Sequence, residues 1–154
     1  MLDGSIRAVR TALDEAEHRD VAVNPNLAAH TSLYGPFKAL MATDPRTDHR
    51  RGLQLEPGRA DRDTVRQAER WISGGADSLT LQPAMTMVDV LVRLRDAQAV
   101  PIVAYSTSGE WDALRALGAT KMVEYLAMLK RSGADQVLTF AAETVARHLE
   151  AARA

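Results

Sequence analysis

Apolar and polar residues follow one another along this chain in two patterns, one typical of helices and one typical of buried strands. Helices are expected at residues 5–18, 61–73 and 86–97, from residue 110 onward, over a further stretch that ends near 131, and at 144–152. In the last helix, Val145 and Leu149 are expected on the buried side. Short apolar strands are expected at residues 20–23, 78–81, 100–105 and 136–140. Strands of this kind that alternate with helices indicate an α/β fold, a parallel sheet covered by helices.

The four strand–helix units predict a (β/α)4 half of a TIM-type barrel. A repeated Gly-Ala-Asp, at residues 75–77 and 133–135, supports this, because in both places it ends a helix and leads directly into a strand. It also hints at an internal duplication. Four strands alone leave two open sheet edges, which tend to pair with another chain. Two chains that close one barrel and one small open sheet are both compatible with the sequence.

Composition narrows the class of protein without naming a function. The chain has 154 residues, 46% of them apolar and 25% charged, which is typical of a soluble single domain spanning residues 1–154. The formal net charge of −1 gives no electrostatic reason to expect nucleic acid or an anionic membrane as a partner. No apolar run is long enough for a membrane span, and the N-terminus lacks the apolar core of a signal peptide. The absence of cysteine excludes disulfides, thiolate metal sites and a cysteine nucleophile, and it fits a cytoplasmic protein.

The most informative stretch is residues 77–89, which reads as a short buried strand, a proline break and the start of a helix. In parallel α/β proteins, chemistry is placed where strands end and helices begin. Gln82 is the polar residue at that point. It is either a contact to a substrate or a hydrogen-bonded residue of the rim, and both interpretations stay open.

Four blocks of sequence carry a resemblance to a known family. They are Tyr-Gly-Pro-Phe at 34–37, the segment 75–90, Pro-Ile-Val-Ala-Tyr-Ser-Thr-Ser-Gly-Glu at 101–110, and Ser-Gly-Ala-Asp-Gln-Val-Leu-Thr-Phe at 132–140. In this order they resemble the porphobilinogen synthase (5-aminolevulinate dehydratase) family, and Met-Leu-Asp-Gly at 1–4 resembles a further segment of it. The resemblance covers nearly the whole chain but only the C-terminal half of the family, so it also implies half of a barrel.

The resemblance implies a changed reaction centre. Enzymes of this family condense two molecules of 5-aminolevulinate into a pyrrole, using two lysines on neighbouring strands that form imines with the substrate ketone. Gln82 stands where the principal lysine is expected, and the other lysine aligns with Ala28 or Ala29. Neither an amide nitrogen nor a methyl group can form that imine. The lysines of this chain are Lys38, Lys121 and Lys130.

The rest of the family's pocket is partly retained, again by resemblance. Tyr34, Arg50, Gln54 and Ser108 match substrate-binding or lid positions, and Lys38 stands where the family has a carboxylate-binding arginine. Phe140 replaces a carboxylate-binding tyrosine. The family's zinc-binding cysteines belong to the half that this chain does not match, so no metal site carries over and no cofactor is expected.

Other polar residues have both a functional and a structural interpretation. Ser106, Thr107 and Ser108 either bind a carboxylate or phosphate at a helix N-terminus or are plain N-caps. His30 and His49 are candidate acid–base residues, although spacing places no partner carboxylate beside them. Glu110 is expected to be a capping or structural residue. Residues 43–58 are polar, and form either a lid or a solvated connector.

Two classes of function remain. In the first, the chain is a diverged enzyme that acts on a small keto or amino acid by a lyase or condensation step, in specialised metabolism. In the second, it is a pseudoenzyme that binds a metabolite or a partner chain. In both, a homodimer or a complementary half-barrel chain would complete the barrel, and pyrrole synthesis from 5-aminolevulinate is not expected.

Overall fold

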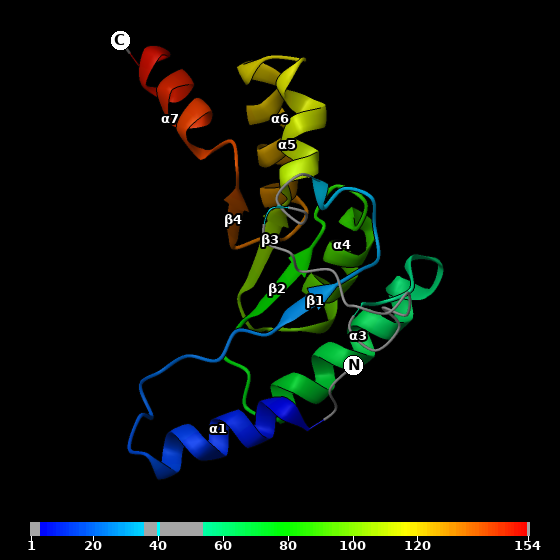
Figure 1. Ribbon diagram of the computed structural model, residues 1–154, viewed down its shortest axis with the longest axis vertical. Coiled ribbons are helices and arrows are strands. Elements are labelled where there is room, and N and C mark those ends of the chain that lie inside the picture. Colours follow the sequence, from blue (N-terminus) through cyan, green and yellow to red (C-terminus); the bar gives the residue numbers. More distant parts are fainter. Residues whose placement is uncertain (1–3, 36–39, 41–53, 154) are drawn as a thin grey trace.

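The fold is built on four parallel strands that follow one another in chain order (Figure 1). A computed structural model of the chain describes residues 4–35, 40 and 54–153. The elements are α1 (Ser5–Glu15), β1 (Asn26–Ala28), the short 3-10 helix η1 (Pro57–Arg59), α3 (Ala60–Ser73), β2 (Leu79–Gln82), α4 (Val88–Ala97), β3 (Ile102–Ser106), α5 (Ser108–Arg115), α6 (Ala119–Arg131), β4 (Gln136–Thr139) and α7 (Ala142–Ala151). The α/β class and the parallel sheet are therefore confirmed.

The sheet has the order β1-β2-β3-β4, and every neighbouring pair is parallel. Each strand is joined to the next by at least one helix, which is the repeating unit of a β/α barrel. The described residues form four such units, so their sheet is an arc with β1 at one edge and β4 at the other. This is the architecture of half a barrel, as the sequence predicted.

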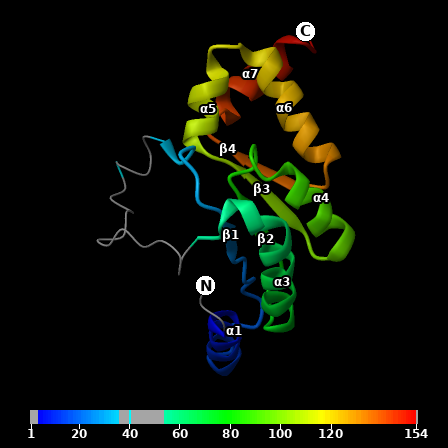
Figure 2. The same cartoon turned by 90° about the vertical axis from the view of Figure 1, so that its right-hand side faces the viewer.

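The two faces of the sheet have different surroundings. Leu79, Leu81, Ile102 and Ala104 are fully buried and form the core together with α3 and α4, which pack side by side (Figure 2). Residues that alternate with these along the strands point to the other face. We call this second face the open face, and its residues are Asn26, Ala28, Thr80, Gln82, Val103, Tyr105, Gln136 and Leu138. On it, Leu138 is 53% exposed.

The first strand lies later in the chain than expected. The β-rich residues 20–23 were predicted as the strand and Asn24-Pro25-Asn26 as its end, but β1 begins at Asn26, directly after the proline. Pro25 has no N–H to give to a ladder, yet its carbonyl accepts a hydrogen bond from the Thr80 N–H at 3.0 Å. The chain is thus already aligned with β2 at the proline, and Asn26 is the first residue in register with it.

The last helix is less buried than expected. No residue of α7 is buried, and Leu149, predicted on the buried side with Val145, is 43% exposed. The physical reason is that α7 packs mainly against α6 and has no second layer on its other side. Much of its surface therefore remains exposed in the described part of the chain.

The two Gly-Ala-Asp segments form the same joint at the start of two strands. The Asp77 carboxylate accepts a hydrogen bond from the Val23 N–H at 2.7 Å, and the Asp77 N–H donates to the Val23 carbonyl at 2.9 Å. Asp135 makes the same pair with Ile102, at 2.7 and 2.9 Å. Asp135 therefore ties the start of β4 to β3, and Asp77 ties the start of β2 to the segment that leads into β1.

An arginine completes each joint. Arg10 of α1 lies 3.8 Å from the Asp77 carboxylate, and Arg95 of α4 makes an ion pair with Asp135. The stems of these arginines lie directly over Gly75 and Gly133, where a Cβ atom would approach side-chain carbons to 2.7 and 2.6 Å. Both glycines have positive φ, +100° and +112°, so glycine is required for conformation as well as for space. The repeated sequence thus corresponds to a repeated structure, which we call the Arg–Gly–Asp joint.

Candidate functional site

Gln82 is the last residue of β2 and lies at the carboxyl end of the sheet. Its carbonyl accepts a hydrogen bond from the Ala29 N–H at 2.8 Å, and a cis peptide bond joins it to Pro83. Its side chain is half-buried and belongs to the open face. In the register of the sheet, Ala28 of β1 is its direct neighbour. Gln82 therefore sits at the strand end where the sequence predicted a site.

The turn that carries Tyr34 is held against the N-terminus of α5. The Gly109 N–H donates to the Leu33 carbonyl at 3.1 Å, and the Thr107 hydroxyl donates to the same oxygen. The Ser108 hydroxyl donates to the Tyr34 carbonyl at 2.8 Å. The Tyr34 phenol in turn donates to the Ala29 carbonyl at 2.8 Å, at the end of β1. Two site residues far apart in sequence, Tyr34 and Ser108, are thereby brought into contact.

These bonds show what the hydroxyls of the serine–threonine run contact within the protein. Thr107 occupies the N-cap position of α5 but makes no side-chain cap bond, because its hydroxyl is used by Leu33. Thr107 therefore holds the N-cap position without capping the helix through its side chain. Ser106 is the last residue of β3 and is fully buried, so it is not open to a ligand from solvent.

Gln54 lies beside His30 at the end of β1. The Leu55 N–H donates to the Ala28 carbonyl at 2.7 Å, and the His30 N–H donates to the Leu55 carbonyl at 2.9 Å. This short parallel bridge fixes the backbone next to Gln54. The Gln54 Oε1 atom lies 3.1 Å from His30 Nδ1. Sequence spacing suggested no partner for His30. In the structure its partner is the side-chain amide of a residue 24 positions later in the chain.

Glu110 has the structural role that was one of its two expected roles, but its burial was not foreseen. Its side chain is fully buried. Its Oε2 atom accepts a hydrogen bond from the Tyr125 phenol of α6 at 2.7 Å, and its Oε1 atom accepts one from the Met85 N–H at 3.3 Å. Burial, and then the Glu110 carboxylate, raises the pKa of Tyr125 above its usual range, and the same two causes raise the pKa of Tyr105. Glu110 therefore connects the loop after Gln82 to α5 and α6.

The two lysines within the described residues lie away from the strand ends. Lys121 and Lys130 lie in α6, where Lys121 pairs with Glu124 and Lys130 donates to the Asp135 carbonyl, so neither is at the strand ends of β1 and β2. Lys38, Arg50 and His49 lie outside the described residues, as does most of the segment 43–58. Hydrogen bonds to the backbone at the end of β1 connect the described site residues, which are Gln82, Tyr34, Gln54 and Ser108.

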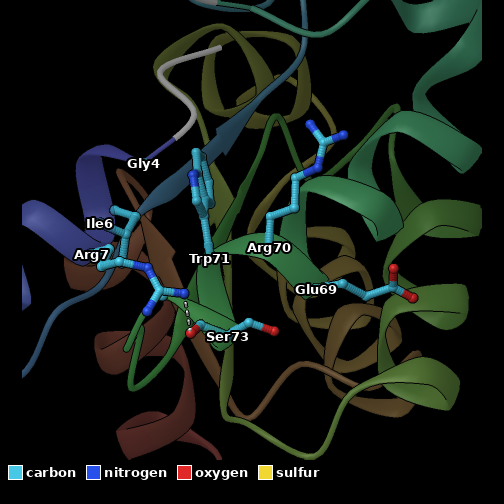
Figure 3. Close-up of a pocket in the computed structure, with 8 residues that line it drawn as sticks. Gly4, Ile6, Arg7, Glu69, Arg70, Trp71 and Ser73 are labelled. Carbon is cyan, nitrogen blue, oxygen red and sulfur yellow. Dashed lines mark hydrogen bonds between the residues drawn. The ribbon is translucent and has the colours of Figure 1, made fainter.

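The described residues offer no group of three histidine, aspartate or glutamate side chains that could hold a metal ion. None of the helices of residues 4–35 and 54–153 is long and apolar enough to cross a membrane. A hollow of about 420 Å³ lies elsewhere, between α1 and the end of α3, where the Arg7 guanidinium donates to the Ser73 carbonyl beside Trp71 (Figure 3). Ser73 is the last residue of the helix that precedes β2, so this hollow is at the opposite end of the sheet from Gln82.

Comparisons with known proteins agree on one family. The family described as delta-aminolevulinic acid dehydratase matches residues 1–148. The chloroplastic enzyme of Physcomitrium patens is 37% identical over 99% of this chain and 37% of its own length, and the enzyme of Synechococcus elongatus is 32% identical over 97% of this chain and 48% of its own. A crystal structure of the enzyme from Toxoplasma gondii, in complex with its reaction product porphobilinogen, superposes with a TM-score of 0.88 at 30% identity, covering 96% of this chain and 44% of that one.

The chain thus spans less than half the length of these relatives. The part it spans is the arc of four parallel strands with their helices. The chain belongs to the delta-aminolevulinic acid dehydratase (porphobilinogen synthase) family, and it has the fold of half of that family's TIM-type barrel.

Proposed function

We propose that this chain binds a small keto or amino acid at the carboxyl ends of its strands and acts on it without a lysine imine. The observation that supports this most is the pairing of Ala28 with Gln82 across β1 and β2. The family's lysines act from neighbouring strands, and by resemblance they would fall at Gln82 and at Ala28 or Ala29. Ala29 is 1% exposed and faces the helices, whereas Ala28 shares the open face with Gln82, which favours Ala28. An alanine beside a glutamine offers no amine for imine formation.

Non-covalent binding groups remain in reach of this pair. Tyr34, Gln54, His30 and Ser108 are connected to the end of β1 by the hydrogen bonds described above. The Gln54 amide and the His30 imidazole suit the oxygen atoms of a small acid, while the hydroxyls of Tyr34 and Ser108 donate to backbone carbonyls and hold the turn in place. By resemblance, Arg50 would add a charge partner for a carboxylate.

We propose further that a second half-barrel, a copy of this chain or a complementary one, completes the site. The support is that β1 and β4 are edge strands, and that Leu138 and Phe140, near the β4 edge, are 53% and 39% exposed. Exposed strand edges and apolar side chains are what a barrel closure would cover. If the second half is a copy of this chain, light scattering at micromolar concentration gives a dimer. A monomer would contradict closure by a second copy and leave a complementary chain as the partner to be sought. A cytoplasmic location is proposed from composition alone.

The alternative is a pseudoenzyme that binds a metabolite or a partner chain. It is favoured by Phe140, which takes the place of a carboxylate-binding tyrosine by resemblance and has no hydroxyl. Its ring lies stacked on Tyr105 of the open face, with ring centres 6.3 Å apart. A stacked aromatic pair offers contact area, and Phe140 itself has no group for acid–base chemistry.

Imine trapping tests the proposal directly. The protein is incubated with levulinate or 5-aminolevulinate and reduced with borohydride, and its mass is measured by mass spectrometry. We expect saturable binding by calorimetry, no covalent adduct and no porphobilinogen. Gln82→Lys is expected to gain a trapped adduct, whereas Gln82→Arg, which adds a charge but no reactive amine, is not. An adduct in the unmodified chain, or pyrrole formation, would show that a lysine still performs the chemistry.

A further inference from the structure

His30 continues β1 on the open face. Its N–H donates to the Leu55 carbonyl, and the preceding Ala29 N–H donates to the Gln82 carbonyl, so the extended ladder reaches residue 30. Leu27 and Ala29 are 0% and 1% exposed and face the core, and the residues that alternate with them face the other way. His30, which is exposed, therefore lies on the same face as Ala28, one step closer to the barrel mouth.

Gln54 gives the His30 imidazole a defined orientation. The atom of Gln54 that faces Nδ1, at 3.1 Å, is the amide oxygen, which can only accept a hydrogen bond. A hydrogen bond between these two atoms requires the proton on Nδ1 and leaves Nε2 as an acceptor. Gln54 is itself held in place, since the next residue, Leu55, is 7% exposed and bonded on both sides to β1. A group that fixes the tautomer of a histidine in this way is the usual companion of an acid–base histidine.

We propose that His30, oriented by Gln54, is the proton-transfer group of this site. The proposal rests on the proposed function, in which the substrate is a small keto acid and no lysine imine forms. Nε2 would take a proton from the carbon next to the ketone. The carbon–hydrogen bond breaks, its electron pair remains on the substrate as an enolate, and the proton makes the imidazole an imidazolium. Return of that proton regenerates both partners, so no oxidant or reductant is needed.

The other described histidines provide matched controls. His18 follows α1 near the start of the chain, and His148 lies in α7, so neither belongs to the carboxyl ends of the strands. Gln82 has a different part in the proposal. It lies at the end of the neighbouring strand on the same face, and its amide can donate to an enolate oxygen.

The tautomer can be measured without any ligand. Nitrogen NMR of the imidazole rings is expected to show His30 with the proton on Nδ1, and Gln54→Ala is expected to restore the Nε2–H form that free imidazoles prefer. His148 is expected to be unchanged in the same variant. If His30 carries its proton on Nε2 in the unmodified protein, or if Gln54→Ala leaves its spectrum unchanged, the proposal is overturned.

Proton transfer is measured as deuterium uptake by levulinate in heavy water. We expect exchange next to the ketone with the unmodified protein and with His148→Ala, and a loss of about 10²-fold or more in His30→Ala. Calorimetry on the same samples separates the two proposals. If levulinate binds but is not exchanged, or is exchanged equally by His30→Ala, then His30 is not the proton-transfer group and the proposed function stands. If levulinate does not bind at all, the proposed function fails, and the role of His30 fails with it.

Discussion

Gly109 allows a direct test of the contact that assembles the site. It is the second residue of α5, where the helix by itself would accept alanine and gain about 1 kcal/mol over glycine. The structure reverses this preference. A Cβ atom at Gly109 would lie 2.4 Å from the Leu33 carbonyl oxygen and 2.7 Å from its carbonyl carbon. Both are backbone atoms, so no side-chain rotation can relieve the overlap, and Gly109→Ala must displace the turn.

The size of the effect follows from the hydrogen bonds that the turn would lose. They are the bonds from the Gly109 N–H and the Thr107 hydroxyl to Leu33, and the bond from the Ser108 hydroxyl to Tyr34. Each contributes about 1 kcal/mol, so their loss costs roughly 3 kcal/mol. The helix preference of alanine offsets about 1 kcal/mol of this. We therefore expect Gly109→Ala to lower the free energy of unfolding by about 2 kcal/mol, and the melting temperature by roughly 4–8 °C for a chain of this length.

Urea and thermal unfolding of Gly109→Ala are to be compared with Gly58→Ala. At Gly58 a Cβ atom meets nothing within 4 Å and φ is not positive, so alanine is expected to be neutral or to stabilise by a few tenths of a kcal/mol. Levulinate affinity should fall in Gly109→Ala and not in Gly58→Ala, since Tyr34 and Ser108 depend on the displaced turn. If Gly109→Ala is as stable as Gly58→Ala, the tight contact between the turn and α5 is not present in solution.

Three further predictions concern buried or paired polar groups. The N–H of Ile102, and then the Arg95 guanidinium, hold the pKa of Asp135 below its usual value. The carboxylate thus adds stability that is present above its unfolded pKa of about 4 and is lost as the pH falls through the lower folded value. In Asp135→Asn, the free energy of unfolding measured with urea should fall less as the pH is lowered. A pH profile identical to that of the unmodified protein would contradict this. Glu110→Ala leaves the partly buried Tyr125 phenol and the Met85 N–H without their partner and should cost about 2 kcal/mol or more in urea unfolding. A change under about 0.5 kcal/mol would refute the bridging role. Because the pKa of Tyr125 is raised, Tyr125→Phe should remove the tyrosine that ionises last in an alkaline absorbance titration. If the variant instead loses a tyrosine that ionises at lower pH, the result would be inconsistent with the burial of Tyr125.

The sequence predicted the later strands well and the first one poorly. Residues 78–81, 100–105 and 136–140 are short apolar runs, and two of them follow a Gly-Ala-Asp that marks their start, so pattern alone located β2, β3 and β4 to within about two residues. Residues 20–23 have the stronger strand composition, yet Val21 is 45% exposed. What decides the position of β1 is its register with β2, and pairing with a strand 50 residues away leaves no local signal. The exposed α7 has the same explanation, because an amphipathic pattern predicts an apolar face and says nothing of a partner.

Site residues were predictable where chemistry follows from a strand end, and not where it follows from a long-range contact. Gln82 could be identified because a proline marks the end of its strand. The Gln54 amide beside His30 could not, since spacing within one sequence does not bring the two segments together. Thr107 reads locally as an N-cap, but the Leu33 carbonyl competes for its hydroxyl. Glu110 reads as a polar first-turn residue, and only the packing of α6 over it shows that the carboxylate is buried.

The repeated Arg–Gly–Asp joint has a consequence for how this chain can be rearranged. Both partners of the first joint lie between residues 10 and 77, and both partners of the second lie between residues 95 and 135. A break in the loop at 83–87 would therefore separate neither pair. Residues 5–82 and 88–139 form two segments, which we call cassettes, and each contains both partners of one joint. An exchange between relatives that changes over at this loop is therefore expected to keep both joints, whereas a change-over inside a cassette would separate the partners of one joint.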